Sequence, residues 1–205
     1  MPTTGEPANQ SPHPGPEAPE RVRRLRRAER REQILAAATQ AFAGAGFAAT
    51  SLDDIAAEAR ISRVMLYRHF DSKTDLYRAV LDRVCARLVA TVGERDFTDD
   101  SVDALVGAAA DDPAGFRLLF QHAAREPEFR AEAGRFRAGM VAVAHRELAR
   151  TIPDGAWARW AAQLAPTVAI EAIIAWLDAG QPDPDRAPER VRQALAGVIQ
   201  AAQQR

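Results

Sequence analysis

Apolar residues recur at helical spacing along nearly the whole chain after Arg30, and no segment shows the strict alternation of a half-buried strand. The first apolar stripe lies on one side of a helix that Gly44 and Gly46 end. It comprises Ile34, Leu35, Ala38, Ala41, Phe42 and Ala45. A chain patterned in this way builds its core by packing helix on helix. We therefore predict an all-α fold with about nine helices.

Capping residues mark where several of these helices begin. Ser51, followed three residues later by Asp54, opens a helix of about nine residues, and Ser62 caps a third one. Asp112-Pro113 supplies an N-cap and a first helical residue. Later helices are expected from Pro127 to about 148, over 156–179 with a bend or a new start at Pro166, and over 191–202.

Charge is divided unevenly along the chain, although the formal net charge is only −1. Residues 21–90 carry a net charge of +6, whereas residues 1–20 carry −3 and residues 91–205 carry −4. Seven arginines lie within 21–31. A basic segment in front of an acidic body indicates that any nucleic-acid surface is local.

The first 20 residues contain six prolines and almost no apolar side chains, which predicts a disordered leader before a basic arm at 21–27. The N-terminus lacks the apolar region of a signal peptide, and no stretch approaches 18 consecutive apolar residues. Cys85 is the only cysteine, which excludes an internal disulfide. We therefore expect a cytoplasmic protein with no membrane partner.

Two short helices joined by a tight turn, at 51–59 and 62–70, have the layout of a helix-turn-helix. If Leu66 and Phe70 face inward, the outward-facing residues are Val64, Met65, Tyr67 and Arg68. A solvated surface rarely carries Val, Met and Tyr together. In the DNA major groove, apolar groups contact thymine methyls and arginine contacts guanine. The spacing alone leaves open a helical hairpin in a protein-interaction module or a small helical enzyme.

The run ARISRVMLYRHFDSK at 59–73 resembles the signature of TetR-type transcriptional regulators. TSLDDIA at 50–56 and REQIL at 31–35 match two further blocks of that signature in order and spacing. The resemblance covers residues 28–88, and beyond about residue 90 only helix number and length agree. It implies a helix-turn-helix DNA-binding domain at 28–88 and a helical ligand-binding and dimerisation domain at 89–205.

The resemblance also implies which residues contact DNA. Ser51 and Lys73 would bind phosphates at helix N-termini, whereas Arg63 and its two successors would face base edges. The basic arm before them would add phosphate or minor-groove contacts. The full expected set is Ser51, Arg63, Val64, Met65, Tyr67, Arg68, His69, Lys73, Arg23, Arg24, Arg26 and Arg27.

Two positions depart from the pattern of the family. Arg60 stands where the turn normally has glycine, and a left-handed arginine there would cost about 1 kcal/mol. Val64 stands where glycine or proline is frequent, so the operator preference of relatives does not transfer to this chain.

The helix at 156–179 is apolar on more than one side, and a second chain is the natural cover for it. We therefore expect a homodimer, which would present two recognition helices to two half-sites. The expected interface residues are Ile170, Ile173, Ile174, Leu177, Val191, Leu195, Val198 and Ile199. The expected walls of an effector pocket are Phe116, Leu119, Phe120, His122, Phe136, Met140 and Trp160, each of which is singly more typical of plain core.

The sequence shows no cluster of acid, base and nucleophile, and no cofactor or metal motif. We expect neither catalysis nor a bound cofactor. Taken together, the residues and the resemblance predict a dimeric repressor that binds a pseudo-palindromic double-stranded DNA operator. An unidentified small-molecule effector would release it.

Overall fold

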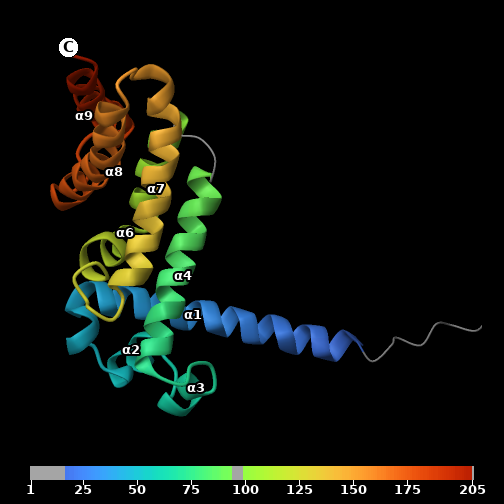
Figure 1. Cartoon of the computed structure of the whole chain (residues 1–205). Helices are drawn as coiled ribbons and strands as arrows, with labels where there is room; N and C mark the ends of the chain where they lie inside the picture. The colour runs from blue at the N-terminus through green and yellow to red at the C-terminus, as the bar shows by residue number, and fades with distance from the viewer. Residues whose placement is uncertain (1–16, 94–98, 205) are drawn as a thin grey trace, which may run out of the picture.

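The computed structural model describes residues 17–93 and 99–204, with side chains described from Arg26 and again from Asp100. Within these ranges the fold is all-α, as predicted, with nine α-helices (Figure 1). They are α1 (Glu17–Ala49), α2 (Leu52–Glu58), α3 (Arg63–Tyr67), α4 (Lys73–Val92), α5 (Asp99–Asp111), α6 (Pro113–Arg117), α7 (Arg130–Thr151), α8 (Gly155–Asp178) and α9 (Ala187–Gln203). A π-helical turn spans Leu118–His122 and a 3₁₀ turn spans Pro184–Arg186.

Helix α4 joins the two ends of the molecule (Figure 1). Its first turns lie beside α1, α2 and α3, and its later turns run beside α7 toward the end that holds α8 and α9. One continuous core follows this path from Ile34 in α1 to Leu195 in α9. The expected domain boundary at 88/89 falls inside α4, so the two proposed domains share both a helix and a core.

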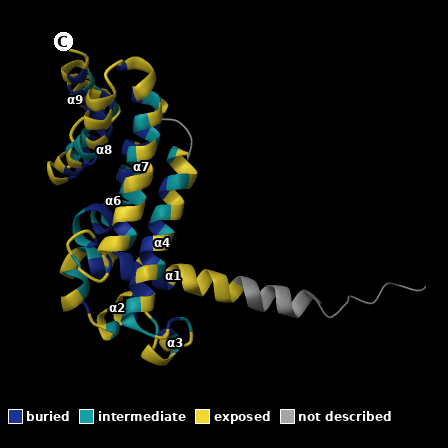
Figure 2. Ribbon diagram, viewed as in Figure 1, coloured by how far each residue is buried: buried dark blue, intermediate teal, exposed yellow. Residues whose placement is uncertain are grey.

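Helix α1 is longer than its apolar stripe (Figure 2). It begins at Glu17, so the last four residues of the expected leader are helical and the expected arm at 21–27 is part of α1. Pro19 is tolerated because the first turn of a helix needs no backbone donor. Residues 1–16 lie outside the part of the chain that the structure describes.

The predicted caps are confirmed. Ser51 forms a reciprocal capping box with Asp54, and the hydroxyl of Ser62 accepts the backbone N–H of Met65. The carboxylate of Asp112 accepts the N–H of Gly115, with Pro113 at the first helical position. These side chains satisfy donors that a helix start leaves free, and so they fix where α2, α3 and α6 begin.

The prediction missed one helix and placed the start of another too early. Helix α5 was not predicted, although Val102, Leu105, Val106 and Ala109 form a buried apolar stripe along it. Helix α7 begins at Arg130 rather than at Pro127, since residues 123–129 form turns. Helix α8 continues through Pro166, which removes one backbone donor but is itself buried by neighbouring helices.

Helix α8 is long and apolar enough to cross a membrane by length and composition, although it lacks 18 consecutive apolar residues. Half of its apolar window is buried inside the chain, as in the core helix of a water-exposed protein. It packs against both α7 and α9. Helix α8 is therefore the helix against which the other long helices of the C-terminal half pack.

We expect Gly115→Ala to destabilise the fold. An added Cβ would lie 2.9 Å from Val84 Cγ2 and 2.5 Å from Asp112 Oδ2, so α6 would have to move away from α4. The expected loss is about 1–3 kcal/mol in urea unfolding. Gly107→Ala is the matched control: its Cβ meets nothing within 4 Å, and the free energy of unfolding should rise by about 0.5–1 kcal/mol. Equal stability of the two variants would contradict the close approach.

Candidate nucleic-acid interface

The outer face of α3 carries exposed apolar side chains. Leu66 and Phe70 are buried beneath it, as predicted. Val64 is 65% exposed and Tyr67 is 43% exposed, which makes them two of the four large hydrophobic residues exposed in the described part of the chain. Exposed Val and Tyr side by side on a short helix are typical of a contact surface rather than of a solvated face.

Arg63 lies on the same face and is held in place before any ligand arrives. Its Nη1 donates to Asp53 Oδ2 at 2.8 Å, and its Nη2 donates to the Tyr67 hydroxyl at 3.4 Å. These two partners raise the pKa of Arg63, with the Tyr67 contribution the larger. Asp53 belongs to α2, so this pair orients the guanidinium across both helices of the motif. Sequence reasoning did not identify Asp53.

The turn between α2 and α3 has the geometry expected from the family pattern. Arg60 has φ 53°, a left-handed conformation that favours glycine. Its N–H donates to Ala57 O at 3.0 Å, and the N–H of Ile61 donates to Ala56 O at 2.9 Å. These two bonds form a Schellman ending for α2. Arginine therefore carries the backbone strain that glycine would avoid.

Lys73 faces the protein rather than the expected phosphate. Its Nζ donates to the carbonyl oxygens of Phe47 at 2.8 Å, Thr50 at 3.1 Å and Ala48 at 3.4 Å. It also lies 4.5 Å from the centre of the Phe47 ring. An ammonium has three N–H donors, and here all three have carbonyl partners. We therefore remove Lys73 from the proposed DNA contacts and assign it to the junction of α1 and α4.

The C-terminal end of the motif lies close to the basic part of α1. The guanidinium of Arg31 is 5.0 Å from the centre of the Phe70 ring. Burial lowers the pKa of His69, and the charges of Arg27, Arg31 and Arg30 lower it further. His69 is therefore neutral near pH 7. Arg26 and Arg27 are exposed, whereas the side chains of Arg23 and Arg24 lie outside the described residues.

Of the remaining expected contacts, Ser51 and Arg68 are exposed, and Met65 is half-buried on the outer side of α3. Hydrogen bonds join Arg63 to Asp53 and Tyr67, while the other expected residues of the motif lie on α2 and α3 or at their ends. We name the outer surface of the motif the α3 face. It consists of Ser51, Asp53, Arg63, Val64, Met65, Tyr67, Arg68 and His69.

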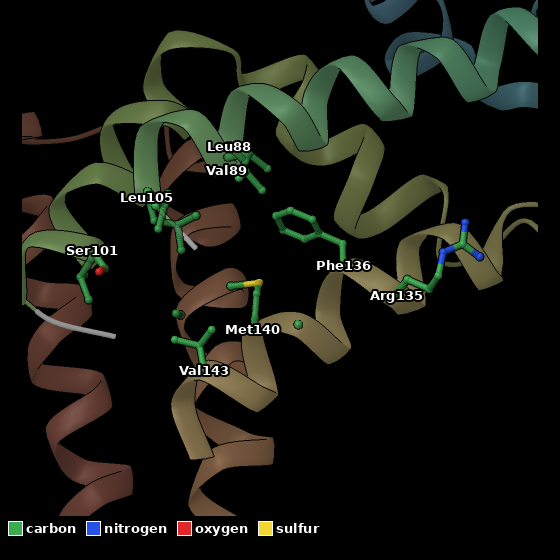
Figure 3. A pocket seen from close by; sticks show the side chains of 13 residues that line it. Leu88, Val89, Ser101, Leu105, Arg135, Phe136, Met140 and Val143 are labelled. Carbon is green, nitrogen blue, oxygen red and sulfur yellow. The ribbon is translucent and has the colours of Figure 1, made fainter. Parts of the chain in front are cut away.

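A second candidate site is an apolar cavity of about 280 Å³ near the far end of α4 (Figure 3). It lies between the last turns of α4 and helices α5, α7 and α8. Its lining is Leu88, Val89, Val92, Gly93, Ser101, Val102, Leu105, Arg135, Phe136, Gly139, Met140, Val143 and Ala169. Phe136 and Met140 are the expected wall residues that it includes.

The other expected wall residues lie elsewhere. Phe116, Leu119 and Phe120 are buried core, and the Phe120 ring contacts Phe136 at 5.8 Å between centres. His122 is half-buried, which lowers its pKa. Trp160 lies near the start of α8 and is 40% exposed. The apolar stripes of α4 and α7 contain many of the residues that line the cavity. The prediction instead favoured aromatic residues such as Phe116 in α6.

The expected dimer residues do not form a free face. Seven of the eight are buried within the single chain, and Ile199 is partly buried. The seven are Ile170, Ile173, Ile174, Leu177, Val191, Leu195 and Val198. They hold α8 and α9 together and against the core, because one chain has enough helices to cover them. A second copy would have to contact the outer sides of these helices.

The described residues give little support to metal binding or to nucleophilic catalysis. No group of three or more His, Cys, Asp or Glu is placed to hold a metal ion there. Burial raises the pKa of Cys85 to about 11, so its thiol is protonated and a poor nucleophile.

Comparison with known proteins points to one family. The family model described as "Bacterial regulatory proteins, tetR family" matches residues 34–80. The transcriptional activator FasR of Mycolicibacterium smegmatis is 40% identical over 110 residues, which is 50% of each chain. The transcriptional repressor SCO4008 of Streptomyces coelicolor is 34% identical over 89 residues, 43% of this chain and 46% of its own. The chain thus matches half or less of the length of these relatives.

Solved structures extend the likeness to the whole fold. A TetR-like regulator from Rhodococcus sp. RHA1 has a TM-score of 0.69 and 21% identity, covering 81% of this chain and 93% of its own. FadR of Bacillus subtilis, solved with stearoyl-CoA, has a TM-score of 0.62 and 17% identity over 82% of this chain and 97% of its own. At these identities the likeness concerns the fold alone.

We expect Arg60→Gly to stabilise the protein by up to about 1 kcal/mol, because glycine relieves the strain at φ 53°. Thermal and urea unfolding measure the change. Arg60→Ala is the matched control, since it removes the charge but keeps the Cβ, and it should bring no such gain. A loss of stability in Arg60→Gly would show that the side chain, not the backbone, dominates at this turn.

Proposed function

We propose that this chain, a member of the TetR family of bacterial regulatory proteins, is a cytoplasmic repressor that binds an operator as a homodimer and leaves it when a small molecule binds. The observation that carries the DNA-binding part is the α3 face. It combines a preoriented arginine with exposed Val64 and Tyr67. Arginine reads guanine edges, and apolar groups contact thymine methyls in the major groove.

The basic stretch of α1 supports a second set of contacts. Arg26 and Arg27 are exposed, and the charge of Arg27 acts on His69 at the end of the motif. Positive side chains in this position would bind phosphates of any sequence, and so would add affinity without specificity. The acidic charge of residues 91–205 keeps the rest of the molecule away from DNA.

Homodimerisation would use the outer sides of α8 and α9. On α9, Arg190, Ala194, Gly197 and Ala201 are exposed at helical spacing. Small residues allow two helices to approach closely, and α8 offers exposed Trp160 beside half-buried Leu164. A dimer would place two α3 faces on one side of a duplex, as a pseudo-palindromic operator requires.

Release would act through α4. Its first turn is fixed to the end of α1 by Lys73, and its last turns carry Val89 and Val92 at the cavity. A ligand that fits better when α4 is tilted would favour a dimer whose α3 faces no longer match the groove spacing.

Arg63→Ala should weaken operator binding by about 1–3 kcal/mol and relax the preference at one base pair, with a smaller effect on random DNA. The contrast variant, Arg26→Gln with Arg27→Gln, should weaken both DNAs alike and make the salt dependence shallower by roughly 0.9 per lost contact. Gel shift on genomic fragments and on random duplexes, at two salt concentrations, measures both. Unchanged binding of both variants would contradict DNA binding by these surfaces.

The wild-type protein should sediment as a dimer at micromolar concentration, and Gly197→Arg should give folded monomers. A Cβ at Gly197 meets nothing within 4 Å in the single chain, so the variant disturbs only an external contact. Gly107→Arg, equally open but on α5, is the control that should stay dimeric. Ile173→Glu is unsuitable because Ile173 is fully buried, and the charge would unfold the monomer. A dimeric Gly197→Arg would exclude this interface.

A further inference from the structure

The cavity at the end of α4 is lined almost wholly by aliphatic side chains. Among the lining residues that the structure describes, Phe136 is the one aromatic side chain and Met140 is the flexible one beside it (Figure 3). No carboxylate is among these described residues, so they offer a cation neither a counter-charge nor an aromatic cage. The described lining therefore favours a flexible apolar ligand body.

One charged side chain borders the cavity. Arg135 precedes Phe136 on α7, and its side chain extends away from the apolar side chains of the cavity, on the far side of Phe136 from Ser101 (Figure 3). Its guanidinium would have to turn back past Phe136 to meet a ligand in the cavity. Arg135 is exposed and has no ion-pair partner in the part of the chain that the structure describes. Two other arginines of α7 do have partners: Arg137 donates to Thr167, and Arg150 pairs with Glu147.

We propose that this cavity binds a single-chain aliphatic carboxylate of medium length, with its chain among the apolar side chains and its carboxylate at Arg135. A guanidinium is the side chain best suited to a carboxylate, because it can donate two parallel hydrogen bonds. The role of this ligand as the releasing effector rests on the proposed function, whereas its binding to the cavity does not.

The size of the cavity limits the length of the chain. At about 280 Å³ the cavity is at the small end of the range for ligand pockets, which favours a chain of medium length over a long one. Ligand pockets of drug-sized molecules are commonly larger, about 300–1,000 Å³. A much longer chain would have to push α4 and α7 apart.

The position of the cavity explains how such a ligand would be sensed. Leu88, Val89 and Val92 contribute one wall from α4, and Phe136 and Met140 contribute the opposite wall from α7. Near its other end, α4 is tied to the start of α7 by the ion pairs of Arg78 with Glu128 and Glu132. An alkyl chain between the two helices would therefore move the far end of α4 relative to a fixed near end.

The test uses the full-length protein and four probes: sodium decanoate, 1-decanol, decyltrimethylammonium and sodium stearate. Thermal stability measures binding, and gel shift with a genomic fragment measures release. Decanoate should raise the melting temperature most and weaken DNA binding at least tenfold. Decanol should act more weakly, and the ammonium should have no effect. An equal or larger effect of the ammonium would overturn the charge assignment, and a larger effect of stearate would overturn the length.

Two variants locate the site. Arg135→Gln should weaken decanoate binding about tenfold and leave decanol binding unchanged, and Arg135→Lys should restore part of the loss. Gly139→Leu should abolish binding of both probes, because its side chain enters open space at the cavity and needs no shift of the fold. Equal loss of decanoate and decanol in Arg135→Gln would overturn the role of Arg135, and full binding by Gly139→Leu would overturn the site.

The outcomes separate this proposal from the proposed function. If the protein binds DNA but no probe raises its melting temperature, the ligand proposal is wrong and the DNA-binding proposal stands. If decanoate raises the melting temperature but the protein binds no DNA fragment, the ligand proposal stands and the DNA-binding proposal is wrong. If decanoate binds but leaves the DNA complex intact, its role as the releasing effector is wrong.

Discussion

The contact on which the arrangement depends is that of Lys73 with the end of α1. An ammonium placed on three carbonyl oxygens neutralises the negative end of a helix and satisfies acceptors that the helix leaves free. Its attraction to the Phe47 ring adds to the same contact. Because Lys73 is also the first residue of α4, this side chain joins α1 to α4 at the motif, in addition to the contact of the Phe42 and Tyr77 rings and the ion pair of Arg83 with Glu32.

The same junction continues into the C-terminal half through aromatic rings. The Phe47 ring lies 5.1 Å from Tyr77 of α4 and 4.8 Å from Phe129, which immediately precedes α7. Tyr77 is fully buried, and its hydroxyl has no hydrogen-bond partner among the residues that the structure describes. A buried polar atom without a partner destabilises the fold, yet the ring fills the space where three helices meet. Any tilt of α4 must repack this cluster, so the motif and the cavity do not move independently.

The local parts of this architecture could be predicted from the sequence. Caps at Ser51, Ser62 and Asp112 depend on neighbouring residues, and the left-handed Arg60 follows from its place in a short motif. The long-range parts could not. Whether Ile173 faces a partner or its own chain depends on how many helices cover α8, and a stripe of apolar residues is the same in either case.

The lining of the cavity escaped prediction for a related reason. Phe116 and Val89 are both apolar residues on helices, but Phe116 packs against Phe120 while Val89 borders open space. A cavity exists where side chains fail to fill the gap between helices, and that is a property of spacing rather than of residue type. Lys73 shows the converse, since a basic residue in a DNA-binding motif turned inward to carbonyls that no periodicity reveals.

The pairing of Arg63 with Asp53 bears on how specific the α3 face can be. If the α3 face binds DNA as proposed, Asp53 brings a negative charge to a surface close to phosphates, which disfavours binding to DNA of any sequence. The arginine must exchange that carboxylate for a partner on the DNA, and a guanine edge offers two acceptors in compensation. A base pair without guanine at that position offers Arg63 fewer acceptors. Asp53 then loses its arginine partner, and the contacts of Arg63 with the DNA compensate less for that loss. On the proposed DNA-binding face, Asp53 would thus weaken binding to every DNA sequence. It would weaken binding to the operator least, and this difference in affinity is what specificity requires.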